Sequence, residues 1–347
     1  MVKKGRQIKS NAMDRINELS DDLLVKILSF VPTKVSVSTS ILSKRWEFLW
    51  MWVPKLEYID FEYNRSKSSL LRYRDFINKN LPLHKAPIIE SLRLRFLSAL
   101  FRHADLNLWV EIAVSRCVRE LELCIDHDSV LPNSLYTCKS LVTLKLEGNK
   151  VRVNVHGTRL VLFIHSVCSS GGCVIDTPSL KYCEVEDHRD SFSYSINHMP
   201  KLEEADVTVG KGLQEFLGSI TSVKRLTLTC PASFKNVEEF MYPAGIVFDQ
   251  LENLKLITYK NGWLKLLFRL LNDSPKLRVL RLPVFGYVVD QEQISCSIEQ
   301  SWIPECLLKS LETFEFEGCD KGKLEEREFL SFLFKHARCL KPPSFLS

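Results

Sequence analysis

Residues 14–50 read DRINELSDDLLVKILSFVPTKVSVSTSILSKRWEFLW, and this stretch determines how the chain is organised. Its first half predicts a helix with one apolar face, because apolar residues recur there at helical spacing. These residues are Leu19, Leu24, Ile27, Leu28 and Val31. Ser20 stands at the N-cap position, where a side-chain oxygen accepts a backbone N–H. Pro32 ends the helix, since the residue before a proline avoids the α region.

A second apolar stripe closes the stretch and predicts a further short helix. It consists of Leu42, Trp46, Leu49 and Trp50, spaced i, i+4, i+7 and i+8. Thr33 is expected to cap a short helical turn between the two stripes. Together the stripes hold more apolar surface than a unit of this size buries internally, which indicates a binding surface. The alternative is a helical hairpin whose apolar residues serve only the protein's own core.

The stretch resembles the F-box, in the form found in plant proteins that join an F-box to leucine-rich repeats and a C-terminal FBD domain. The matching residues are Asp14-Arg15-Ile16, Leu19, Asp22-Leu23-Leu24, Ile27-Leu28, Pro32-Thr33-Lys34, Thr39-Ser40, Leu42-Ser43-Lys44-Arg45-Trp46 and Leu49-Trp50. The family usually has proline where this chain has Ser20. Serine still caps a helix, so the expected effect is weakened rather than lost binding.

The resemblance implies that the F-box docks on a Skp-type adaptor, which links it to a cullin–RING ligase core. The residues expected to contact the adaptor are Leu19, Ser20, Leu24, Ile27, Leu28, Pro32, Leu42, Arg45, Trp46 and Leu49. The rest of the chain would then hold a target protein for ubiquitination.

The composition is that of an ordinary globular protein, with 45% hydrophobic residues and a net charge of +5 over 347 residues. This mild charge leaves no basic footprint for nucleic acid. Residues 1–12 lack the apolar core of a signal peptide and are expected to form a disordered basic tail. The longest apolar run, residues 160–164, is too short to span a membrane. Eleven cysteines, an odd number, indicate reduced thiols and a location in the nucleus or cytoplasm.

An apolar-x-x-apolar-x-apolar hexamer recurs through the middle of the chain. Its ten copies begin at residues 56, 89, 118, 141, 180, 202, 223, 251, 277 and 311. Most of the intervals lie in or near the range of leucine-rich repeats. Each hexamer predicts a short strand, and the strands stack because no repeat buries its apolar face alone. Residues 106–114 and 262–271 are expected to be helical on the convex side.

One residue of each hexamer, between its last two apolar positions, should face the concave surface. These residues are Asp60, Arg93, Glu122, Lys145, Glu184, Asp206, Thr227, Lys255, Arg281 and Glu315. The first four alternate in sign, which favours a cross-strand charge ladder worth ~0.2–1 kcal/mol per opposite pair. The stretch from Glu184 onward does not alternate and is expected to be unpaired. Its residues Glu184, Asp206, Thr227, Lys255 and Arg281 are the candidates for contact with a target.

The longest interval, 39 residues from 141 to 180, holds no clean hexamer. Relatives of the resembling family usually place further repeats between these landmarks. Residues 168–173 read CSSGGC, a turn-rich run. We predict that residues 165–175 are mobile and divide the array into two partly independent halves, because a solenoid is held together by nearest-neighbour interfaces.

From about residue 291 the chain resembles the FBD domain. The residues that carry this are Trp302, Pro304-Glu305-Cys306-Leu307-Leu308, Ser310-Leu311-Glu312-Thr313-Phe314, Glu325-Glu326-Arg327-Glu328 and Ala337-Arg338-Cys339-Leu340-Lys341. A helix is expected over residues 324–338. Family members usually add one more strand after it, which Pro342-Pro343 should block because proline cannot donate to a ladder. The domain is expected to cap the solenoid.

The predicted fold is therefore mixed α/β: a three-helix F-box, an irregular leucine-rich-repeat solenoid with parallel strands on its concave face, and an FBD cap. The boundaries are a tail (residues 1–12), the F-box (13–53), the solenoid (54–290) and the FBD domain (291–347). No HExxH, GxSxG or Gly-rich phosphate loop occurs, so neither an enzyme nor a cofactor or metal site is expected.

The favoured function is the substrate-recognition subunit of an SCF-type E3 ubiquitin ligase. Two alternatives remain open. One is a repeat-based binding module whose F-box does not engage a ligase. The other is an enzyme whose site assembles only in space.

Overall fold

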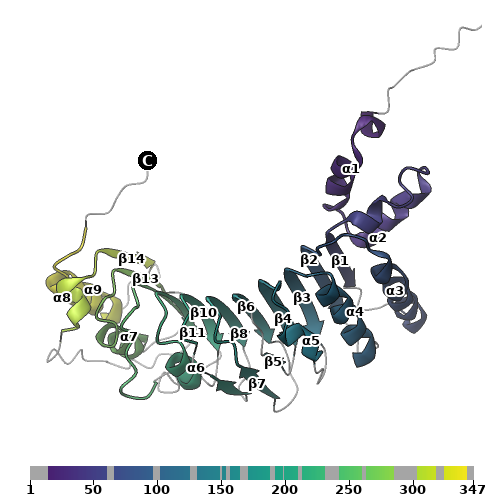
Figure 1. The fold of residues 1–347 in the computed structure, drawn as a ribbon. Helices are drawn as coiled ribbons and strands as arrows, with labels where there is room; N and C mark the ends of the chain where they lie inside the picture. Colours follow the sequence, from purple (N-terminus) through teal and green to yellow (C-terminus); the bar gives the residue numbers. More distant parts are fainter. Residues whose placement is uncertain are drawn as a thin grey trace, which may run out of the picture.

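The protein is a curved array of parallel strands with a small helical unit at its N-terminal end (Figure 1). The computed structural model describes residues 15–60, 66–96, 102–125, 131–148, 151–153, 157–164, 171–187, 192–197, 199–209, 213–230, 242–259, 263–284, 303–317 and 324–341. Within these ranges, no helix is both long and apolar enough to cross a membrane. The basic tail predicted over residues 1–12 lies outside them.

The helical unit spans residues 15–52. Its elements are η1 (Arg15–Glu18), α1 (Asp21–Leu28), α2 (Thr33–Ser38), η2 (Thr39–Ile41) and η3 (Leu49–Trp52). Ser20 caps α1 as predicted, because its side chain accepts the backbone N–H of Leu23 at 3.4 Å. Thr33 does not cap α2; its hydroxyl accepts the backbone N–H of Glu57 at 2.8 Å.

The prediction of a third helix from the stripe at Leu42–Trp50 was wrong. Residues 44–48 form turns, and regular structure resumes only in η3. The Trp50 indole N–H donates to the Glu47 carbonyl at 3.1 Å and so takes an acceptor that an α-helix would use for its own backbone. Trp46, Leu49 and Trp50 are buried nonetheless, whereas Leu42 is exposed. Helical spacing therefore identified large buried side chains in a segment that is not an α-helix.

The main sheet has eleven strands, and every neighbouring pair is parallel. In spatial order they are β1 (Lys55–Asp60), β2 (Ser91–Phe96), β3 (Glu120–Ile125), β4 (Thr143–Gly148), β6 (Arg159–Ile164), β8 (Tyr182–Asp187), β10 (Glu204–Val209), β11 (Arg225–Cys230), β12 (Asn253–Thr258), β13 (Val279–Pro283) and β14 (Thr313–Glu317). Ten of these strands lie at the ten hexamers, nine of them in the predicted register, so the repeat is confirmed. Their side chains alternate between the core and the concave surface, as β11 and β12 illustrate.

The same pair of hydrogen bonds opens most repeats. The second and third residues of a hexamer both donate their backbone N–H to the second residue of the preceding one. Glu312 and Thr313, for example, donate to the Arg278 carbonyl at 2.8 and 3.0 Å. Equivalent pairs join Arg278 and Val279 to Glu252. This paired entry bond sets the register of each strand on its predecessor.

The first hexamer was predicted out of register. Leu56 pairs with Leu92 and Tyr58 with Leu94, so the first repeat begins at Val53 and not at Leu56. Glu57, rather than Asp60, therefore stands opposite Arg93. The concave row accordingly consists of Glu57, Arg93, Glu122, Lys145, Val161, Glu184, Asp206, Thr227, Lys255, Arg281 and Glu315.

The predicted break between residues 141 and 180 was also wrong, because β6 fills it. Leu160 pairs with Leu144 on one side and Cys183 on the other, and Thr158 and Arg159 make the paired entry bond to the Val142 carbonyl. The repeat escapes the hexamer pattern because Gly157 occupies its first apolar position. Of the segment expected to be mobile, residues 165–170 lie outside the described ranges, and residues 171–175 form a strand.

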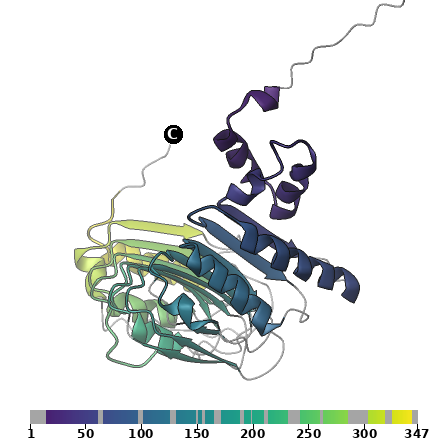
Figure 2. The ribbon, with the colours of Figure 1, turned by 45° about the vertical axis from the view of Figure 1, so that its right-hand side comes forward.

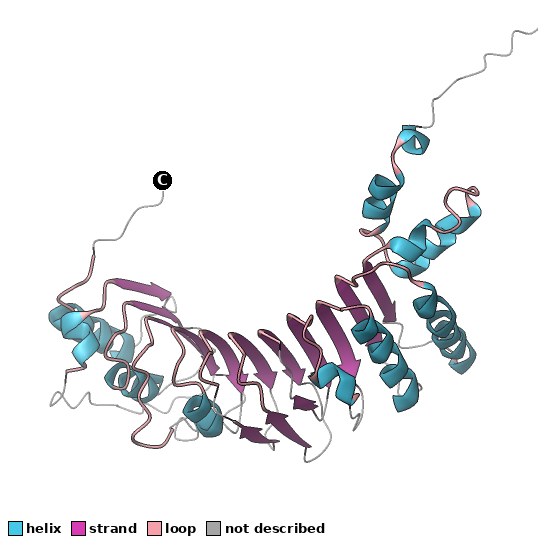
Figure 3. Ribbon diagram, in the orientation of Figure 1, coloured by secondary structure: helices cyan, strands magenta, loops and turns pink. Residues whose placement is uncertain are grey.

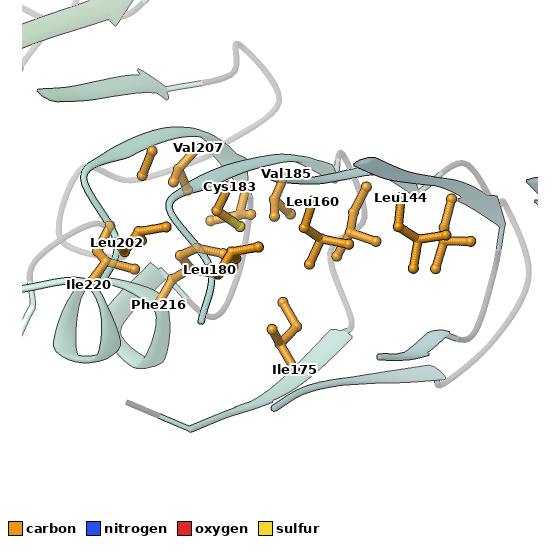
Figure 4. Packing of buried hydrophobic residues seen from close by; sticks show 14 of the residues in the cluster. Leu144, Leu160, Ile175, Leu180, Cys183, Val185, Leu202, Val207, Phe216 and Ile220 are labelled. Atoms are coloured by element: carbon orange, nitrogen blue, oxygen red, sulfur yellow. The ribbon is translucent and has the colours of Figure 1, made fainter. Parts of the chain in front are cut away.

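A second, three-stranded parallel sheet lies on the outer side of this region. It consists of β5 (Val151–Val153), β7 (Gly171–Ile175) and β9 (Phe192–Ile196). Ile175 is fully buried and points from β7 toward Leu160 and Val185 of the main sheet (Figure 4). The small sheet therefore closes the core where the other repeats use helices.

Helices line the convex side of the array elsewhere (Figure 3). They are α3 (Lys67–Asn80), η4 (Leu81–Leu83), α4 (His103–Ser115), α5 (Asn133–Tyr136), α6 (Leu213–Ser219) and α7 (Trp263–Asn272). The convex helices predicted over residues 106–114 and 262–271 correspond to α4 and α7. At the far end, α8 (Glu305–Lys309) and α9 (Leu324–His336) pack behind β13 and β14 (Figure 1).

Replacing Leu160 by alanine should lower the free energy of unfolding by about 2–5 kcal/mol, because it leaves a cavity between β4 and β8. Thr158→Ala removes exposed atoms from the same repeat and should cost less than about 0.5 kcal/mol. Urea denaturation followed by circular dichroism measures the difference. Equal midpoints for the two variants would show that β6 contributes little to the array.

Candidate protein-interaction surfaces

Exposed apolar side chains gather on the helical unit. Of the fifteen large apolar side chains that are exposed in the described residues, nine belong to it. They are Ile16, Leu23, Ile27, Phe30, Val35, Ile41, Leu42, Phe48 and Trp52, and we call them the apolar surface of the helical unit. Monomeric proteins rarely expose so many large apolar groups together, and such surfaces mark binding sites.

Four of the ten residues predicted to contact an adaptor do not reach this surface. Leu24, Leu28, Trp46 and Leu49 are buried in the protein's own core. Periodicity shows which face of a helix is apolar, but not how much of that face the rest of the chain covers. These four side chains therefore stabilise the unit itself and are not available to a partner in this structure.

The other six predicted contacts remain accessible to different degrees. Ile27 is 41% exposed and Leu42 is 65% exposed, so both belong to the apolar surface. Ser20 and Pro32 are exposed, and Leu19 is partly buried. Their contact with an adaptor stays a prediction.

Arg45, also predicted as a contact, has an internal role as well. Its guanidinium donates to the Asp21 carboxylate, with Nε 2.9 Å from Oδ1, and to the Leu19 carbonyl. It thereby ties the turns after residue 43 to the start of α1.

Sequence reasoning missed seven members of the apolar surface, among them Leu23, Phe30 and Trp52. A signal for the first was present, because Leu23 and Ile27 form an i, i+4 pair beside the pair Leu24 and Leu28. A short helix that packs against the core on one side buries only one of two adjacent apolar stripes. One stripe of α1 is buried and the other faces solvent.

The helical unit is joined closely to the first repeat (Figure 2). The Lys85 backbone N–H donates to the Met51 carbonyl at 2.6 Å, and Thr33 accepts from Glu57. His84 is buried in this junction, with its ring 5.3 Å from that of Trp50 and its Nε2 3.5 Å from the Tyr58 hydroxyl. Burial lowers the pKa of His84 to about 4, so the ring is neutral near pH 7.

The His84 junction should make the protein sensitive to acid. Its pKa is lowered from 6.5 to about 4, so between these values the unfolded chain binds a proton that the folded chain excludes. The buried, neutral His84 therefore costs no stability above pH 6.5. As the pH falls toward 4, its effect lowers the free energy of unfolding, by about 3 kcal/mol in total. Other groups titrate too, so the useful quantity is the difference between wild type and His84→Gln in urea denaturation. A difference that stays constant from pH 7 to pH 4 would contradict this assignment.

The concave row begins with the predicted charge ladder, now with Glu57 in place of Asp60. Arg93 lies 3.5 Å from Glu57 and 3.5 Å from Glu122. One step further along the strands, Arg95 pairs with Glu122 at 3.4 Å and Glu147 at 2.6 Å. These pairs are partly exposed, so each contributes modestly to stability.

Beyond the ladder, the row passes Val161, which is 2% exposed and uncharged, and reaches an acidic pair. Glu184 accepts the Tyr182 hydroxyl at 2.8 Å, and the Arg159 guanidinium lies 3.6 Å above the Tyr182 ring. Burial, and after it the neighbouring charge of Glu184, raises the pKa of Asp206 to about 6. The carboxylates of β8 and β10 thus lie close together on the concave face.

The five predicted target contacts do form one row. Glu184, Asp206, Thr227, Lys255 and Arg281 stand opposite one another across β8, β10, β11, β12 and β13. Lys255 lies near enough to oppose the rise in the pKa of Asp206. Arg281 already pairs with Glu315 at 2.7 Å, so the expectation of an unpaired stretch fails at this residue. Within the described ranges, no cluster of His, Cys, Asp or Glu is arranged to hold a metal.

These features define a class of protein: a leucine-rich-repeat solenoid with a charged concave face, carrying a helical unit that exposes an apolar surface. Both surfaces are suited to binding other proteins. The F-box domain family matches residues 16–58, and the FBD family matches residues 299–342. The first match covers the helical unit and β1, and the second covers α8, β14 and α9.

Proteins of Arabidopsis thaliana are similar over almost the whole chain. One FBD-associated F-box protein is 48% identical over 96% of this chain and 98% of its own length. A second is 44% identical over 96% and 99%. An F-box/FBD/LRR-repeat protein is 36% identical over 95% and 92%. The chain therefore belongs to the family of FBD-associated F-box proteins with leucine-rich repeats.

Proposed function

We propose that this protein is the substrate-recognition subunit of an SCF-type E3 ubiquitin ligase, acting in the nucleus or cytoplasm. The F-box match supports a role as an adaptor within a ubiquitin ligase. The observation that carries the proposal is the apolar surface of the helical unit, with nine large side chains exposed to solvent. Leaving such groups in water is unfavourable, and a partner that covers them recovers about 25 cal/mol per Å² of apolar area.

The partner of this surface is a Skp-type adaptor, which connects it to a cullin–RING core. Ile27 and Leu42 are the large apolar predicted contacts that the structure leaves exposed, and Leu23 and Phe30 extend the same surface on α1 and after it. Ser20 and Pro32 border it. Leu24, Leu28, Trp46 and Leu49 support it from below.

The target is held on the concave row from Glu184 to Arg281. Ubiquitination then proceeds by proximity, because binding raises the effective concentration of target lysines near the ubiquitin-conjugating enzyme. This chain performs no chemistry of its own in that scheme. The tight junction around His84 keeps the row at a defined position relative to the adaptor.

Ile27→Asp tests the adaptor interface, because it places an unpaired charge in a surface that binding desolvates. We expect a loss of several kcal/mol, or at least a hundredfold in affinity. Leu108→Asp is a matched control, since Leu108 is 46% exposed against 41% for Ile27 but lies on α4. Calorimetry with a purified Skp-type adaptor measures both variants.

Two results of that experiment would contradict the proposal. If the wild-type chain does not bind the adaptor, the protein is a repeat-based module that works without a ligase. If Ile27→Asp binds as tightly as Leu108→Asp, the apolar surface is not the interface.

Target binding is tested by neutralising the concave row. The triple variant Glu184→Gln, Asp206→Asn, Lys255→Gln should lose proteins that co-purify with the wild type from native tissue, while it keeps the adaptor. The double variant Glu57→Gln, Arg93→Gln alters the ladder on the same face and should retain them. Identical mass-spectrometric profiles for both variants would place the target elsewhere.

A further inference from the structure

The outer edges of the main sheet differ at its two ends in how their backbone groups are hydrogen-bonded. At the first end, every second residue of β1 directs its backbone N–H and C=O away from β2, and side chains form hydrogen bonds with two of these groups. The Glu57 N–H donates to the Thr33 hydroxyl at 2.8 Å, and the Ile59 carbonyl accepts the Tyr73 hydroxyl at 3.4 Å. Covering an edge in this way prevents it from pairing with other strands.

At the other end, no strand in the described part of the chain pairs with the outer edge of β14, which we call the open edge. The Thr313 N–H bonds to Arg278, and the Glu317 carbonyl accepts from Val284 at 2.7 Å, so these residues face β13. The residues between them alternate, and Phe314 and Phe316 therefore direct their backbone N–H and C=O away from β13. Among the strands that the structure describes, none lies beyond β14.

After α9 the chain makes one backbone bond to the residue before β14, and the next two residues in the sequence are prolines. After α9, the Lys341 N–H donates to the Glu312 carbonyl at 2.9 Å, which is the first half of the paired entry bond. The second half would come from residue 342, and the sequence continues Pro342-Pro343. Proline has no backbone N–H, so neither residue can donate to the ladder.

Aromatic rings lie beside the open edge. Phe334 of α9 is 65% exposed, and its ring meets that of Phe314 edge to face at 6.1 Å. Phe314 stacks on Phe316 at 6.2 Å, and both are only partly buried. On the opposite face of β14, Glu315 and Glu317 are exposed.

We propose that the β14 edge binds an extended segment of a partner protein by strand addition. In the bound segment, the side chains that face Phe314, Phe316 and Phe334 are apolar. The alternate side chains, which face Glu315 and Glu317, are basic. A basic residue across from Glu315 would place that carboxylate between two cations, with Arg281 on its other side. The ladder contains the same arrangement with the charges inverted, since Arg93 lies between Glu57 of β1 and Glu122 of β3.

Charge also argues against a second copy of this chain as the occupant. Antiparallel pairing of two β14 edges would bring Glu315 and Glu317 of one copy against the same residues of the other, and like charges directly opposite are destabilising. The inference goes beyond the proposed function, because it adds a protein-binding edge at the end of the array that is farthest from the F-box (Figure 1).

The test uses the full chain and two fluorescent eight-residue peptides, one alternating valine and lysine and one alternating valine and glutamate. At about 0.15 M salt, which screens distant charges, fluorescence anisotropy should show the lysine peptide binding at least tenfold more tightly. Phe316→Pro removes one outward N–H without removing a bond to β13, and should weaken binding at least tenfold. Phe316→Val keeps that N–H and should weaken it no more than threefold.

Four results would overturn the proposal. Equal binding of the two peptides would exclude charge recognition, and unchanged binding to Phe316→Pro would exclude strand addition. A wild-type dimer in sedimentation that Phe316→Pro dissociates would identify a second copy as the occupant. Binding only to a Phe345→Ser, Leu346→Ser variant would mean that the chain's own end occupies the edge.

Discussion

The paired entry bond is the constraint on which the array depends. In most repeats two successive N–H groups converge on one carbonyl of the repeat before, and this contact sets the register of the strand that follows. A slip of one residue would exchange the core face and the concave face. The same bond admits β6, which lacks the leading apolar residue, and it begins again at Lys341. Continuity of the array therefore rests on backbone geometry as much as on leucines.

Most of the array was predictable from the sequence, and the errors in that prediction have identifiable causes. The hexamers are local, so their positions survive irregular intervals between them. The first was misread because residues 53–58 and 56–61 both fit the pattern, and only pairing with β2 decides between them. β6 was missed because glycine at 157 removes the leading apolar side chain. The small outer sheet has no local signature at all.

The candidate surfaces were only half predictable, because exposure is a property of the assembled chain. The stripe through Leu24 and Leu28 is buried, while that through Leu23 and Ile27 faces solvent, although both are equally apolar in sequence. The five-residue row from Glu184 to Arg281 was placed correctly, since strand alternation alone determines it. Its ion pairing was misjudged, although the same alternation puts Glu315 directly opposite Arg281 with the opposite charge.

Val161 interrupts the charged side chains of the concave row between the ladder and the acidic pair. With strands about 4.8 Å apart, the charges on either side of this buried valine, Lys145 and Glu184, are separated by roughly 10 Å, close to the Debye length at physiological salt. A substitution in the ladder near the F-box therefore has little electrostatic effect on the acidic pair farther along. Substitutions on β8 to β13 can therefore accumulate without compensating changes in the ladder beside the F-box. One uncharged position in the row thus separates the ladder from the charges on β8 to β13, while Arg159 of the same strand lies over Tyr182.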